Sequence, residues 1–78
     1  METEIRNIKM EISARNALAG TVVAFEEGVV TAVITIDLGD GNHVVSSITM
    51  DSAKRLGISV GKKVTAIIKA SDVMLAVD

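Results

Sequence analysis

The chain has no cysteine, proline, tryptophan or tyrosine, and only one phenylalanine and one histidine among its 78 residues. Without thiols no disulfide can form, which fits a reducing compartment. A single histidine and no thiolate cannot supply the four ligands of a structural zinc site. Proteins that bind single-stranded nucleic acid stack bases on aromatic side chains, and Phe25 alone serves that purpose poorly.

Long hydrophobic runs and strong charge are also missing. Thr, Asp, Glu or Gly interrupts every apolar run within a few residues, far short of the roughly 20 residues of a membrane span. The first nine residues are charged and lack the apolar region of a secretory signal. A net charge of −2 gives no general attraction to a phosphate backbone. We therefore expect a cytoplasmic protein that binds neither membranes nor nucleic acid.

The chain is short and rich in small aliphatic residues. It has room for one domain, and 49% of its residues are hydrophobic. A domain of this size buries only about 60% of its unfolded surface, so it is marginally stable alone. With disulfides and a structural metal excluded, association with further copies is the remaining route to stability. We expect a homo-oligomer.

The hydrophobic pattern predicts mainly strands. Residues 29–38 alternate most clearly, with apolar side chains at every even position. The turn cluster Gly39-Asp40-Gly41-Asn42 follows and predicts a hairpin. A short helix with Thr49 or Asp51 as its cap would end at Gly57. The other predicted strands cover residues 18–25, 43–49, 64–69 and 73–77.

This order of elements predicts a fold class. Five short strands with one short helix between the third and the fourth are typical of a five-stranded Greek-key barrel of the OB type. The expected fold is therefore all-β with one short helix. Closing the sheet into a barrel would also remove exposed strand edges, which so hydrophobic a chain needs.

Few residues suit catalysis. His43 is the only imidazole, and it lies where a turn meets a strand. Gly39 and Gly41 belong to the hairpin and do not form a phosphate loop. Carboxylates near hairpin ends are best explained as solvated turn residues: Glu26, Glu27, Asp37 and Asp40. We predict no catalytic residue and no directly coordinated metal cation.

Two polar clusters remain after the core is assigned. The first is Ser13, Ala14, Arg15 and Asn16, and the second is Lys69, Ala70 and Ser71. Each combines a cation, a hydroxyl and a bend in the backbone. Arg offers a fork of N–H donors, Lys a compact charge, and backbone N–H groups at a chain reversal can hold an anion. The clusters fit a small oxyanion, although caps and turns use the same residue types.

The same clusters carry a resemblance to a known family. The chain reads SARN followed by ALAGTV, and near its end VTAIIKASDVMLAV. These motifs, with Asp51-Ser52, Leu56-Gly57 and Gly61 between them, are similar to those of the molbindins. Molbindins, or Mop proteins, are small molybdenum-pterin-binding proteins built from a TOBE-type domain. The similarity runs from about Met10 to Val77.

The resemblance implies a fold, an assembly and a ligand. Molbindins have an OB-like barrel, assemble as homohexamers that are trimers of dimers, and bind molybdate or tungstate at subunit interfaces without an organic cofactor or enzyme activity. Carried over by motif, one subunit would supply Ser13, Ala14 and Arg15, with Asn16 completing the motif, and a neighbour would supply Lys69, Ala70 and Ser71. Thr49 and Ser52 would add hydroxyl donors.

The resemblance also suggests a domain boundary and an alternative function. Residues 1–9 would be an N-terminal extension of unknown role, and residues 10–78 the Mop/TOBE domain. The first interpretation is a cytoplasmic protein that stores or buffers molybdate or tungstate. The alternative is a stand-alone sensing module that regulates a partner protein in response to molybdate. A third is a structural oligomer whose polar clusters are caps.

Overall fold

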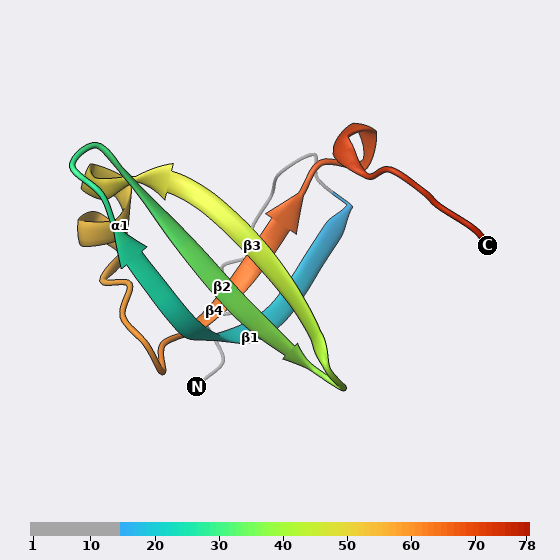
Figure 1. The fold of residues 1–78 in the computed structure, drawn as a ribbon, viewed down its shortest axis with the longest axis horizontal. Coiled ribbons are helices and arrows are strands. Elements are labelled where there is room, and N and C mark those ends of the chain that lie inside the picture. Colours follow the sequence, from blue (N-terminus) through green and yellow to red (C-terminus); the bar gives the residue numbers. More distant parts are fainter. Residues whose placement is uncertain (1–14) are drawn as a thin grey trace.

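The structure is a computed structural model, and it describes residues 15–78. Four antiparallel strands form one curled sheet in the order β3-β2-β1-β4 (Figure 1). The elements in chain order are β1 (Asn16–Glu27), β2 (Thr31–Gly39), β3 (Asn42–Thr49), α1 (Met50–Leu56), β4 (Lys63–Ile68) and the 3₁₀ turn η2 (Ala70–Asp72). The predicted class, mostly β with one short helix, is confirmed.

Strand β2 provides most of the core. Ala32, Ile34 and Ile36 are buried, while the residues between them face outward or are partly covered. Ile34 and Ile36 form the core cluster with Val22 of β1, and Ala53 of α1 is also buried. The two-residue alternation predicted for this stretch is therefore confirmed.

The start of β2 differs from the prediction. The strand was expected from Val29, but it begins at Thr31, and Val29 and Val30 form an exposed bend. The Gly28 N–H donates to the Thr31 carbonyl at 2.8 Å and closes a tight turn. This turn removes both valines from the strand ladder.

Strand β1 is longer than predicted because it serves two partners. Residues 16–21 pair with β4, and residues 21–27 pair with β2, with a bulge between Val22 and Ala24. Gly20 lies where the strand changes partner. A Cβ there would stand 2.6 Å from Ile36 Cγ2 and 2.7 Å from the Asp37 carbonyl oxygen. Only glycine allows this close approach of β1 to β2.

Helix α1 has the ends that its sequence predicts. Thr49 is the N-cap, and its side-chain oxygen accepts a hydrogen bond from the Ser52 N–H. Gly57 ends the helix at φ 67°, in the left-handed region. Of the two caps considered, Thr49 is confirmed, and Asp51 lies in the first turn.

The prediction of a fifth strand at residues 73–77 is wrong for this single chain. These residues follow η2 as an extended tail that leaves the sheet and pairs with no described strand (Figure 1). In η2 the Asp72 N–H donates to the Lys69 carbonyl and the Val73 N–H to the Ala70 carbonyl, and this turn directs the chain outward. The four described strands therefore make an open half-barrel.

The described helices are short. Within residues 15–78, none is long and apolar enough to cross a membrane. Ser13, Ala14 and the predicted N-terminal extension, residues 1–9, lie outside the described residues.

Candidate functional site

Strand pairing brings the described residues of the two predicted polar clusters to the same end of the molecule. Asn16 pairs with Ile68 at the end of the β1–β4 ladder, and the Asn16 side-chain amide donates to the Ile68 carbonyl at 3.2 Å. Arg15 and Lys69 are the next residues on either strand. We call this end, consisting of Arg15, Asn16, Lys69, Ala70 and Ser71, the cationic end.

The turn η2 adds backbone donors to the cationic end. Lys69 is extended, and its side chain makes no capping hydrogen bond to the turn. The amides of Ala70 and Ser71 are the first in the turn, so they have no acceptor within it. Arg15, Lys69, Ala70 and Ser71 are all exposed. The cationic end thus contains two cations, one hydroxyl and two backbone N–H groups that have no acceptor within the turn.

The other two predicted residues form a hydroxyl network at the start of α1. The Thr49 hydroxyl donates to Ser52 Oγ at 3.0 Å while also accepting from the Ser52 N–H at 3.0 Å. The Arg55 guanidinium donates to Ser52 Oγ at 3.2 Å. Ser52 Oγ therefore already accepts two hydrogen bonds, and its own O–H remains available as a donor. We call Thr49, Ser52 and Arg55 the helix cluster.

Sequence reasoning missed Arg55. A signal was available, because Ser52 and Arg55 are three residues apart on a predicted helix and so lie on one face. The guanidinium adds the cation that the two hydroxyls lacked.

The two clusters lie at opposite ends of the sheet in one chain. Thr49 is paired with Thr31 at the start of β2, beside the pairing of Ala32 with Glu27, the last residue of β1. The cationic end is at Asn16, the first residue of β1. Figure 1 shows α1 and the end of β4 on opposite sides of the molecule. A single chain therefore does not gather the predicted residues into one site.

Both clusters offer hydrogen-bond donors, and neither contains a carboxylate. Within residues 15–78, the single ion-pair contact joins His43 Nε2 to Asp37 Oδ1 at 3.9 Å, on the β2–β3 hairpin. In the same part of the chain, no group of three or more His, Cys, Asp or Glu residues could hold a metal ion. Cations and N–H or O–H donors suit an anion.

One mostly apolar hollow has a volume of about 370 Å³. It is lined by residues of β2, β3 and β4, together with Leu56. A smaller hollow of about 300 Å³ is lined by Thr49 together with Val29, Val30, Met50 and Asp51. Neither contains a residue of the cationic end.

Comparison with known proteins identifies the family of this chain. The family model for the TOBE domain matches residues 12–75. The chain belongs to the TOBE domain family. This TOBE domain is 48% identical over 69 residues to a probable molybdenum-pterin-binding protein of Haemophilus influenzae, which covers 88% of this chain and 100% of the relative. The resemblance to the molybdenum-pterin-binding proteins is confirmed.

Solved structures agree with the fold. MopII from Clostridium pasteurianum is 43% identical, with a TM-score of 0.80 over 86% of this chain and 100% of MopII. The cytoplasmic molybdate-binding protein ModG, in a form with molybdate bound, is 39% identical. Its TM-score is 0.86 over 92% of this TOBE domain and 51% of ModG.

Proposed function

We propose that this TOBE domain binds molybdate or tungstate as a free oxyanion, at interfaces between copies of itself, for storage or homeostasis in the cytoplasm. Its relatives support molybdate as the ligand, since they are molybdenum-pterin-binding and molybdate-binding proteins. ModG, described as cytoplasmic, supports the compartment.

One observation carries the interface proposal. The cationic end and the helix cluster are both rich in donors, yet they lie at opposite ends of one chain. Identical copies can place one chain's cationic end near a neighbour's donors, which a single chain cannot do. The proposed set is Ser13, Ala14, Arg15, Asn16, Thr49, Ser52, Lys69, Ala70 and Ser71, now with Arg55.

The chemistry proposed for this set is recognition alone. A tetrahedral dianion accepts hydrogen bonds at every oxygen, and guanidinium, ammonium, hydroxyl and backbone N–H groups donate them. Holding the anion breaks no bond, so the proposal requires neither a catalytic residue nor an organic cofactor.

The proposed assembly is a homohexamer, a trimer of dimers, in which the five-stranded Greek-key OB-like barrel is completed. Residues 10–78 would form the Mop/TOBE domain, and residues 1–9 an extension. An apolar hollow along the open side of the described sheet supports an assembly that covers it.

Native mass spectrometry of the full chain, with and without molybdate, tests the proposal, with sulfate as the control anion. We expect a hexamer that gains discrete molybdate masses and no sulfate masses. A monomer or dimer that gains neither would show that the fold is shared with the relatives but the function is not. A complex with another protein that persists only with molybdate would favour the sensing alternative.

A further inference from the structure

The end of the β1–β4 ladder holds two like charges together. Asn16 pairs with Ile68, and continuing the same register places Arg15 opposite Lys69. Both cations are exposed, and neither belongs to a strand. Like charges that face each other across two chain segments are destabilising, and the ends of strands open more readily than their centres. We therefore expect the cationic end to separate unless another contact keeps it closed.

That contact is a side-chain hydrogen bond from Asn16. Its Nδ2 donates to the Ile68 carbonyl oxygen at 3.2 Å, across 52 positions of sequence. Among the residues that the structure describes, no other side-chain hydrogen bond joins two strands, and the rest join residues two or three positions apart. Asn16 is also half-buried, so water competes for this bond less than it does around the exposed cations.

The acceptor of this hydrogen bond lies at the start of the second cluster. The Ile68 carbonyl and the Lys69 N–H belong to one planar peptide unit, so holding the carbonyl fixes the plane from which the following residues continue. Lys69 leads directly into η2, where its own carbonyl accepts from the Asp72 N–H at 2.9 Å. The donor residue, Asn16, directly follows Arg15. One hydrogen bond therefore ties together the two segments of the cationic end.

We propose that Asn16 is a positioning residue that holds Arg15 and the segment from Lys69 to Ser71 in place before the anion arrives. A site that is already assembled loses less conformational freedom when it binds its ligand. Asn16 thus adds to affinity through the placement of its neighbours and not through contact with the anion. The inference rests on the proposed function, since it assigns a role within the proposed oxyanion site.

Two variants of the full chain test the effect on affinity. Asn16→Ala removes the amide, and Asn16→Asp keeps the shape of the side chain but replaces the donor with an acceptor. A lost hydrogen bond of ordinary strength changes an equilibrium constant by roughly 2- to 10-fold. We expect calorimetric titration with molybdate to show a loss in this range for Asn16→Ala. The loss should be larger for Asn16→Asp, because its carboxylate adds a negative charge near the anion.

Hydrogen exchange in the anion-free chain separates positioning from direct contact. Because the Asp72 N–H donates to the Lys69 carbonyl, its exchange with deuterium, followed by NMR, reports whether η2 is formed. We expect faster exchange at Asp72 in Asn16→Ala than in the unchanged chain. Weaker molybdate binding with unchanged exchange at Asp72 would mean that Asn16 contacts the anion itself, and this result would overturn the inference.

A matched variant controls for a general loss of stability. Ile34→Val shortens a buried side chain of β2, away from the cationic end. It should lower stability by an amount similar to the loss of one hydrogen bond. We expect Ile34→Val to leave both the molybdate affinity and the exchange at Asp72 unchanged. Equal losses of affinity in Ile34→Val and Asn16→Ala would reduce the effect to overall stability and overturn the positioning role.

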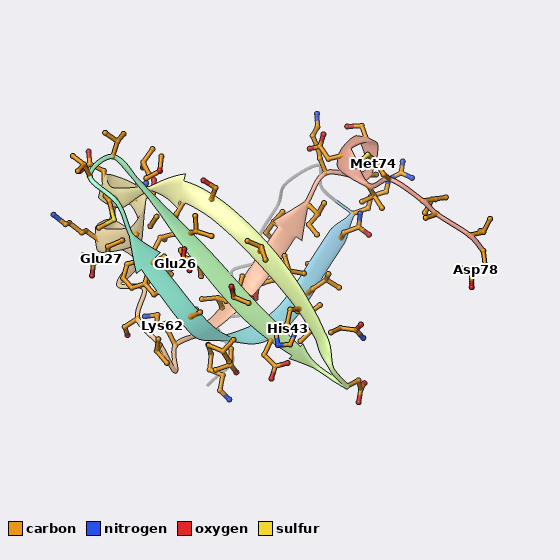
Figure 2. The ribbon with its side chains drawn as sticks, viewed as in Figure 1. Glu26, Glu27, His43, Lys62, Met74 and Asp78 are labelled. Atoms are coloured by element: carbon orange, nitrogen blue, oxygen red, sulfur yellow. The ribbon has the colours of Figure 1, made fainter. Side chains whose placement is uncertain are left out.

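A double-mutant cycle gives an independent measurement. Lys69 directly follows Ile68, whereas Lys62 lies before β4, at the opposite end of that strand (Figure 2). We expect Asn16→Ala to reduce affinity less in a Lys69→Ala background than alone, and by the full amount in a Lys62→Ala background. The full reduction in both backgrounds would overturn the inference.

The unchanged chain separates this inference from the proposed function. If it binds molybdate and Asn16→Ala binds equally well, only the positioning role of Asn16 is wrong. If the unchanged chain binds no molybdate, the proposed function is wrong and the role of Asn16 is lost with it.

Discussion

Two exposed cations, Arg15 and Lys69, come together because β1 pairs with β4. The sequence shows each as an ordinary charged residue close to the start or end of a strand. Their positions become informative only once Asn16 is opposite Ile68. At this scale the cationic end is a consequence of strand register, with its donors arranged on two adjacent segments.

Arg15→Ala and Lys69→Ala should each weaken molybdate binding. A hydrogen bond to a charged group contributes about 1.5–3 kcal/mol, which corresponds to roughly a 10- to 100-fold loss of affinity. Because both side chains are exposed, circular dichroism should show an unchanged fold. Calorimetric titration provides the measurement, with Lys62→Ala as the control, since Lys62 is an exposed lysine in the loop before β4. Equal affinities in all three variants would refute the assignment of these cations.

The roles of two single residues, Arg55 and Gly20, were not predicted from the sequence. Arg55 reaches Ser52 from one helical turn away, a local contact that residue spacing could have revealed. Gly20 is different, because its role depends on Ile36 and Asp37 of another strand. Nothing in the residues around Gly20 indicates that close approach.

At the scale of elements, local signals predicted β2, β3 and α1 well. Two-residue alternation, a glycine-rich hairpin and paired helix caps act within a few residues, so they can be read from the chain directly. The full length of strand β1 and its pairing could not be predicted from local signals. Its bulge and its change of partner arise from contacts with two other strands, and hydrophobic pattern does not encode them.

Removing the Thr49 cap should loosen α1. Thr49→Ala deletes the acceptor of the Ser52 N–H and should lower the free energy of unfolding by about 1 kcal/mol. Thr49→Ser keeps a hydroxyl in the same position and should restore most of that loss. Urea unfolding followed by circular dichroism measures both. If Thr49→Ala is as stable as the unchanged chain, the cap does not contribute to stability.

The whole molecule should be stabilised by its ligand. An anion that binds only the folded assembly adds about 2.7 kcal/mol to the free energy of unfolding when its concentration is 100 times Kd. For a chain of this length, that corresponds to a rise in Tm of roughly 10–20 °C. Thermal scans with molybdate and with equal sulfate measure the effect. A rise of the same size with both anions would indicate general salt stabilisation and no specific site.

The fifth strand shows why the complete fold could not be predicted from one sequence. Residues 73–77 are all apolar, which predicts a buried strand, but the described single chain provides no strand partner for them. Sequence pattern reports that a strand needs neighbours. It does not report whether those neighbours belong to the same chain.

The three-residue turn η2 therefore has a consequence for the size that particles of this protein reach. A tail that binds a different surface of another copy makes a head-to-tail contact, and such contacts polymerise without limit unless the geometry closes them into a ring. The turn at Ala70–Asp72 sets the direction in which the tail leaves the sheet, and this direction determines whether such a contact can close. A turn that lets two chains face each other gives a closed particle, and a slightly different angle gives a growing fibre.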